Sequence, residues 1–421
     1  MRRIKGIALT AACCLLAGGL TGCGVQTESE SGDSYRAAAA MESTPVIHYT
    51  VPESTANVLV DRLGYPAVGE KTAAAKGKEL PADFRLVNAE TGEVVYQGLI
   101  EKATYNAETE LYTGKLQFDE YEEPGEYYIE CDGIGQSYRF SLTENLYEQM
   151  FAELSDRVQE ECKGNDATVR EVTALLTAYE WYPELFEDAD KDGTPDVLDV
   201  TAQWLKNQDS NIENTENEAL QAALLAKFSY LYQKYDKQFA TTCLQRASAI
   251  FEQAQKSMHK DAESFFALAE LYRATGLWNY RNQILEYGSY FENSSSYLEE
   301  TEYLYGAMTY MTTRQKVDVT LCNTFIEKMM NRGEELSRRY KDLIHPVTAK
   351  NNGTEDVLKK ADEILFVNYV LNSYQYHNIL EEFLHYLGGR NLQSVIFYPG
   401  EDDCTGYILL LAQLASMPGE D

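Results

Sequence analysis

Five aspartates lie close together in the stretch DADKDGTPDVLD, which occupies residues 188–199. Counted from its first residue, oxygen-bearing groups stand at positions 1, 3, 5, 7, 9 and 12, with Gly193 at position 6. They belong to Asp188, Asp190, Asp192, Thr194 (through its carbonyl), Asp196 and Asp199. This is the ligand spacing of a twelve-residue calcium loop, with aspartate in the last position where glutamate is usual. A bound dication would relieve the repulsion among the carboxylates. The stretch therefore predicts a Ca²⁺ site.

The same residues also fit a simpler role as a junction between a loop and a helix. Pro195 suits the first turn of a helix. Asp196 or Asp199 would then cap that helix or form local hydrogen bonds. The loop occurs once, whereas calcium loops of bacterial surface repeats usually come in arrays. Both interpretations are open from the sequence.

Other motifs of catalysis or cofactor binding are missing. The sequence contains no glycine-rich phosphate loop, no G-x-S-x-G elbow and no CxxC pair. The five cysteines after Cys23 are irregularly spaced, so we expect free thiols in the core. His377 and His385 are eight residues apart on one expected helix, whereas a metal-binding pair would be three or four apart.

The first 22 residues have the three parts of a lipoprotein signal peptide. Basic residues at positions 2, 3 and 5 precede a short apolar stretch and the sequence LTGC, which ends at Cys23. We expect a mature chain lipidated at Cys23 in the bacterial cell envelope, outside the cytoplasm, with membrane contact only through this anchor. Residues 23–55 are polar and resemble a flexible tether. The net charge of −31 disfavours nucleic acid and anionic lipid surfaces, but would not repel a neutral polysaccharide.

The rest of the chain has two patterns. Residues 56–143 show short alternating runs broken by turns such as Glu-Thr-Gly, which predicts an all-β immunoglobulin-like sandwich. In residues 144–421 apolar residues recur at helical spacing, in about twelve segments. These segments are 144–163, 168–182, 196–208, 217–235, 237–257, 262–275, 278–290, 296–311, 316–338, 354–374, 376–387 and 405–416. Paired helices with loops of uneven length favour an all-α toroid over a solenoid of identical repeats.

Several stretches, in order, resemble family 9 of the glycoside hydrolases, the cellulase group. VLVDRLGYP, FRLVNAETGEVVYQG and EPGEYYIECDGIGQSYRFSL resemble its N-terminal immunoglobulin-like module. DGTPDVLDVTAQWLKNQ, AESFFALAELYRATG and LHYLGGRNLQSVIFYPG resemble parts of its helical domain. The resemblance implies an (α/α)6 six-hairpin barrel over residues 144–421 and a role in the metabolism of β-glucan or cellulose-type polysaccharide.

The resemblance also implies two carboxyl groups that face each other across the sugar, about 6.5–9.5 Å apart, for hydrolysis with inversion. The family takes its base from an Asp-Ala-Gly-Asp motif, but this chain has KGNDATV there, and we expect Asp166 to be a helix N-cap. Glu401 is the candidate acid, although an ordinary acidic helix start explains it equally well. The family's His-His-Arg element is absent, because no histidine follows His385.

Three functions follow from these observations. The first is a hydrolase-like pseudoenzyme that binds a polysaccharide or oligosaccharide, and the missing motifs favour it. The second is an active inverting endo-β-glucanase with an atypical base, although the loss of one carboxylate usually costs orders of magnitude in rate. The third is a surface scaffold for a protein partner. Ca²⁺ is the one cofactor that the sequence suggests.

Overall fold

The computed structural model describes residues 46–52, 55–107, 109–208, 218–254, 260–340, 354–371, 375–399 and 404–416. Nine strands lie in its N-terminal part. They are β1 (Val58–Leu59), β2 (Tyr65–Pro66), β3 (Thr72–Gly77), β4 (Asp83–Asn88), β5 (Val94–Asn106), β6 (Leu111–Gln117), β7 (Gly125–Cys131), β8 (Gly135–Gln136) and β9 (Phe140–Thr143).

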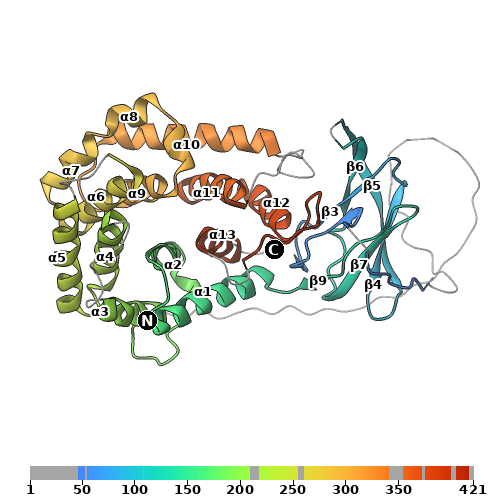
Figure 1. Cartoon of the computed structure of the whole chain (residues 1–421), viewed down its shortest axis with the longest axis horizontal. Helices are drawn as coiled ribbons and strands as arrows, with labels where there is room; N and C mark the ends of the chain where they lie inside the picture. The colour runs from blue at the N-terminus through green and yellow to red at the C-terminus, as the bar shows by residue number, and fades with distance from the viewer. Residues whose placement is uncertain are drawn as a thin grey trace, which may run out of the picture. The chain divides into compact units, whose positions relative to one another are not determined.

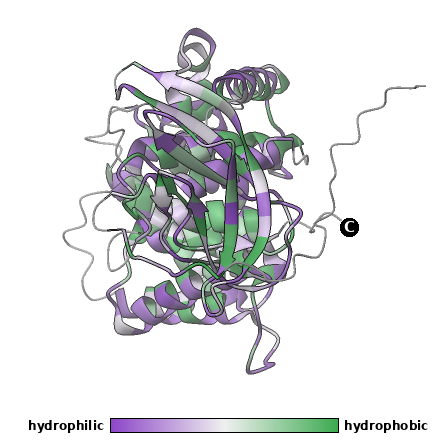
Figure 2. Cartoon of the chain, turned by 90° about the vertical axis from the view of Figure 1, so that its right-hand side faces the viewer, coloured by the Kyte–Doolittle hydropathy of each residue, from purple (hydrophilic) through white to green (hydrophobic). Residues whose placement is uncertain are grey.

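The strands form two sheets that share the long strand β5. Its first half pairs with β4, and its second half pairs with β6, which continues to β3 and β1. On the other side β4 continues to β7, β9 and β2, and only the β2–β9 pair is parallel. Apolar residues from both sheets, such as Ala75, Leu86 and Ile129, form one core. Figure 2 shows hydrophilic and hydrophobic residues alternating along the strands, the period expected of half-buried sheets. The predicted sandwich is confirmed.

The rest of the described chain is helical. The helices are α1 (Leu146–Gly164), α2 (Val169–Trp181), α3 (Asp196–Asn207), α4 (Glu218–Tyr232), α5 (Lys237–Ala254), α6 (Ala262–Thr275), α7 (Trp278–Leu285), α8 (Gly288–Asn293), α9 (Thr301–Thr312), α10 (Val319–Tyr340), α11 (Thr354–Leu371), α12 (His377–Leu387) and α13 (Thr405–Ala415). In the part of the chain that the structure describes, no helix has both the length and the apolar content needed to cross a bilayer.

Six of these helices form a closed inner ring. Contacts run in the order α2, α4, α6, α9, α11 and α13, and then back to α2. Figure 1 shows α2 and α13 enclosed, with α3 and α5 at the periphery. Inner helices are apolar on nearly all sides, and every residue of α13 from Tyr407 to Ala415 is buried. The outer helix α10 instead buries one stripe, as expected of an amphipathic helix: Leu321, Phe325, Met329, Gly333, Leu336 and Tyr340. The predicted (α/α)6 toroid is confirmed.

Two predicted helices are each divided in two. The segment 278–290 becomes α7 and α8, because the N–H groups of Glu286 and Tyr287 bond to carbonyls three residues back, which tightens the chain into a turn. The segment 296–311 becomes the short 3₁₀ helix η4 (Ser296–Glu299) followed by α9. Periodicity alone located the apolar residues correctly but did not reveal these breaks.

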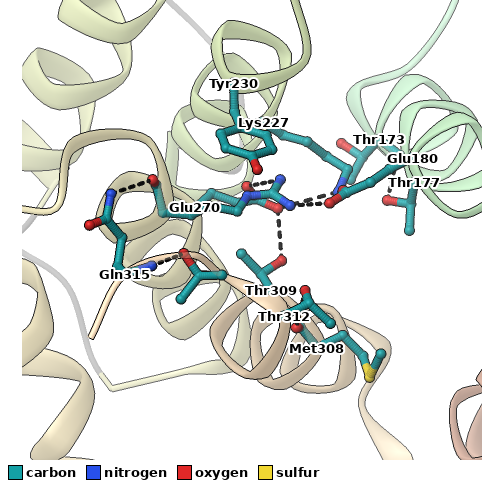
Figure 3. A network of polar contacts seen from close by, with 12 residues as sticks. Thr173, Thr177, Glu180, Lys227, Tyr230, Glu270, Met308, Thr309, Thr312 and Gln315 are labelled. Atoms are coloured by element: carbon teal, nitrogen blue, oxygen red, sulfur yellow. Dashed lines mark hydrogen bonds and ion pairs between the residues drawn. The ribbon is translucent and has the colours of Figure 1, made fainter. Parts of the chain in front are cut away.

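A buried network of ion pairs joins four inner helices through their C-terminal halves (Figure 3). Lys227 on α4 lies 2.5 Å from Glu180 on α2 and 3.3 Å from Glu270 on α6. Arg273 pairs with both glutamates. The Thr309 hydroxyl on α9 donates a 2.9 Å hydrogen bond to Glu270. Burial alone would raise the pKa of Glu180, but the two cations lower it to about 2. Two charges of each sign therefore balance inside the ring.

The sandwich contacts the helical domain through a buried histidine–aspartate pair. His385 Nδ1 on α12 lies 2.9 Å from Asp61 Oδ2, and both side chains are buried. Gly388 lies against the same carboxylate, since a Cβ atom there would be 1.9 Å from Asp61 Oδ1. His385 therefore does have a carboxylate partner, which the spacing of histidines in the sequence did not reveal because Asp61 is in the other domain.

The GGRN sequence, residues 388–391, contributes to the same interface between the sandwich and the helical domain. Arg390 is fully buried; its Nη1 donates to the carbonyl of Thr72 at 3.1 Å and to Glu382 Oε1 at 3.1 Å. Burial raises the pKa of Glu382, but Arg390 outweighs it and lowers the pKa overall. The segment thus binds the sandwich in this structure.

Candidate functional site

A cavity of about 720 Å³ lies at the N-terminal turns of the inner helices. Its volume is within the range of small-ligand sites. Three aromatic side chains and several polar groups form much of the wall. The wall includes Arg170 and Thr173 from α2, Leu220 from α4, Thr301, Glu302 and Tyr305 from α9, Leu358, Lys359 and Asp362 from α11, and Phe397, Thr405 and Tyr407 at and before α13. The cavity is therefore built by five of the six ring helices.

An arginine pairs with the acidic residues at one side of the cavity. Arg170, in the first turn of α2, pairs with Glu302 on α9 and lies 3.2 Å from Glu263 on α6. It is half-exposed, so solvent screens these pairs. The contacts place a guanidinium where α2, α6 and α9 begin, and both carboxylates are paired with it.

Asp362 is the buried acid of the cavity. It lies on α11, and the Thr301 hydroxyl donates a 2.7 Å hydrogen bond to its Oδ2. Burial disfavours the ionised form, and with a smaller contribution from Glu363 it raises the pKa of Asp362 to about 7. No sequence motif marks this residue, because it resembles any other acid on a helix until the ring closes around it.

The start of α2 differs from the expectation. Asp166 is not the N-cap; Thr168 is, and its hydroxyl accepts from the N–H of Glu171 while Glu171 accepts from the N–H of Thr168 in a capping box. Asp166 is exposed and lies beside Gly164, outside the cavity wall. The pattern Thr-x-x-Glu was the sequence signal that would have identified the correct cap.

Comparison with known protein families identifies two matching regions. The family described as cellulase N-terminal ig-like domain matches residues 53–136. The family described as glycosyl hydrolase family 9 matches residues 179–403, which is more than half of the chain. The protein belongs to glycosyl hydrolase family 9.

Solved structures agree on the fold of this family 9 protein. A metagenome-derived glycoside hydrolase family 9 endoglucanase has a TM-score of 0.66 at 16% identity, with 80% of this chain and 84% of that chain covered. A family 9 protein of Bacteroides ovatus gives 0.61 at 14% identity, covering 80% and 85%. AaCel9A, in complex with a cellobiose-like isofagomine, gives 0.61 at 15% identity, covering 80% and 82%. Among curated proteins, no sequence matches.

The acidic loop of this family 9 protein brings three of its predicted ligands together. One carboxylate oxygen each of Asp188, Asp190 and Asp196 lies within 4.8 Å of the others. Such oxygens, with free positions for water, suit Ca²⁺. Backbone N–H groups already orient two of them: Gly193 donates to Asp188 at 3.0 Å, and Ala189 donates to Asp196 at 3.2 Å. The residues present therefore fit a calcium ion.

The other predicted ligands lie outside this triad. The Asp192 carboxylate accepts from the N–H of Thr194 at 2.8 Å. Burial raises the pKa of Asp199 to about 6, with the neighbouring aspartates adding to the effect. Pro195 is the N-cap of α3 and so precedes the first turn in which the sequence placed it. The loop does lead into a helix, as the junction interpretation predicts, and the Ca²⁺ site stays a prediction.

Two predicted functional residues cannot be placed. Glu401, the candidate acid, and Cys23, the candidate lipidation site, lie outside the described residues. The chain is described again from Cys404, whose thiol lies buried 3.9 Å from the Glu171 carboxylate. Helix α13 begins one residue later and reaches the cavity through Thr405.

Proposed function

We propose that this family 9 protein binds β-glucan-type polysaccharide in the cavity and is impaired as a hydrolase. Membership of the family supports a role in carbohydrate metabolism. AaCel9A, which has the same fold, holds a cellobiose-like isofagomine. The cavity wall combines aromatic side chains with short polar groups, the composition that suits a neutral sugar.

The start of α2 is the observation that carries the proposed impairment. Inverting hydrolysis requires a carboxylate that is free to activate water. The acid of this first turn, Glu171, accepts from both the N–H and the hydroxyl of Thr168 at 2.8 Å. The preceding residue, Arg170, forms ion pairs with Glu302 and Glu263. A carboxylate beside a guanidinium is a weaker base. No carboxylate in the described part of this turn is therefore available as a base.

The proposal has two further parts that concern location and metal. We propose that acyl chains on Cys23 hold the protein to the cell envelope, as the LTGC sequence indicates. Ca²⁺ held by Asp188, Asp190 and Asp196 would fix the loop that begins α3. The ion would make this loop rigid, and the loop residues do not line the cavity.

Reducing-end release tests the proposed impairment. The mature protein, with calcium present, would be incubated with soluble β-glucans and cello-oligosaccharides beside a Glu401→Gln variant. A matched control is Glu160→Gln, which alters an exposed ion pair on α1. We expect no release above blank in any sample. Turnover in the wild type and in the Glu160 control that vanishes in the Glu401 variant would establish the alternative, an active endo-β-glucanase with an atypical base.

A further inference from the structure

Asp362 differs from the other acids of the cavity in its surroundings. It is 6% exposed, yet it contributes to the cavity wall. Within the described ranges no ion pair includes it, whereas Arg170 pairs with Glu302 in the same cavity wall. The next residue on α11, Glu363, lies outside this wall and pairs with Arg332. Its hydrogen bond comes from the neutral hydroxyl of Thr301. Ionisation of Asp362 would thus leave a buried charge without a counter-ion, which is costly.

The charged groups around Asp362 do not supply that counter-ion. On its own helix Glu363 adds repulsion, while Lys359 and Glu355 stand one and two turns earlier at the cavity rim. From η4 to α9 the charged residues that line the cavity are acids, and α13 has no charged residue. Burial and the nearby Asp362 raise the pKa of Tyr305 well above its usual value, so this phenol is neutral. Arg170 on α2 is already paired. The local field therefore favours the neutral carboxyl, in agreement with a pKa raised by burial to about 7.

The hydrogen bond with Thr301 engages one oxygen of the Asp362 carboxyl. The hydroxyl lies 2.7 Å from Oδ2, which leaves Oδ1 outside this contact. A neutral carboxyl can donate a hydrogen bond, whereas a carboxylate can only accept one. The neutral form of Asp362 can therefore donate a hydrogen bond to a ligand in the cavity, and the ionised form can only accept one.

We propose that Asp362, as a neutral carboxyl, donates a hydrogen bond to a hydroxyl of a β-linked glucan oligosaccharide bound in the cavity, and that its ionisation weakens binding. This rests on the proposed function, because it assigns a contact within the same cavity. A sugar hydroxyl suits the position, since it accepts from the carboxyl and remains free to donate to neighbouring oxygens. A glycan that covers the cavity would also take the remaining solvent from an ionised Asp362, and a buried carboxylate without a counter-ion is costly.

The test is the pH dependence of affinity for cellotetraose, measured by calorimetric titration of the full mature chain between pH 6 and pH 8. If only the neutral form binds and half of Asp362 is ionised at about pH 7, the neutral fraction falls about tenfold over this range, and affinity falls about tenfold with it. Asp362→Asn keeps a donor at the same place without a titrating proton, so its affinity should stay constant across the range.

The control is Asp356→Asn, the same substitution on the same helix. Asp356 pairs with Lys360 and is not part of the cavity wall, so this variant should keep the slope of the wild type. Wild-type affinity that does not change with pH, or an unchanged slope in Asp362→Asn, would overturn the assignment of Asp362 alone. Absence of cellotetraose binding at every pH in wild type and control would overturn the proposed function and this contact with it.

Discussion

Substitution of Glu270 by glutamine should destabilise the helical ring strongly. Glu270 is fully buried and contacts Lys227, Arg273 and Thr309. Glutamine keeps the shape but removes one negative charge, so Glu180 alone would face two buried cations. Removal of one partner from a buried ion pair costs about 3–5 kcal/mol. We expect a loss of this size in the free energy of unfolding, measured by urea denaturation at pH 7.

A double variant separates charge balance from packing. Lys227→Met added to Glu270→Gln leaves one charge of each sign, Glu180 opposite Arg273, and should recover much of the lost stability. The exposed control Glu160→Gln should change the free energy of unfolding by no more than about 0.5 kcal/mol. If Glu270→Gln unfolds at the same urea concentration as this control, or if the double variant is less stable than the single one, the charge-balance argument is refuted.

Four further outcomes can be checked. The pKa of Glu180 lies near 2 in the fold against 4.5 in a model peptide, so its contribution of about 3 kcal/mol should be lost as the pH falls from 4.5 to 2, and urea titrations of Glu180→Gln should lack that loss. The pKa of Asp362 is raised instead, so the contribution of this residue to stability should fall by about 3 kcal/mol between pH 4 and pH 7, and Asp362→Asn should lack this part of the pH dependence. Calcium at 100 times its dissociation constant should stabilise the protein by about 2.7 kcal/mol, and calorimetric scans of Asp188→Ala should show no such gain. Cys23→Ser should move the protein expressed in bacteria from the detergent phase to the aqueous phase in detergent partition, whereas equal partition would contradict the anchor.

The helices could be predicted from the sequence because each depends on residues close in the chain. The predicted segment 168–182 became α2 at residues 169–181, and 405–416 became α13 at 405–415. Apolar spacing and turn residues act over three or four positions, so they can be read locally. The N-cap of α2 is also determined by residues close in the chain. Thr168 and Asp166 are both residue types that cap helices well, and only Thr168 is followed three positions later by a glutamate, Glu171, that completes a capping box.

The cavity and the networks could not be predicted because they join residues far apart in the chain. Asp61 meets His385 across 324 positions, and Thr301 meets Asp362 across 61. Their pairing depends on how the ring closes and on how the sandwich docks, which no periodicity encodes. The family resemblance predicted the ring but directed attention to Glu401, whereas the buried acid that the structure describes in the cavity is Asp362.

Binding without hydrolysis is decided most directly by one titration. Cellohexaose would be titrated into the mature protein at pH 6 in a calorimeter, and the sugar recovered from the cell would be analysed by mass spectrometry. We expect a saturable heat and recovery of intact cellohexaose. Recovery of shorter oligosaccharides would contradict the proposed impairment, and absence of any binding heat with the hexasaccharide intact would contradict glycan binding in this cavity.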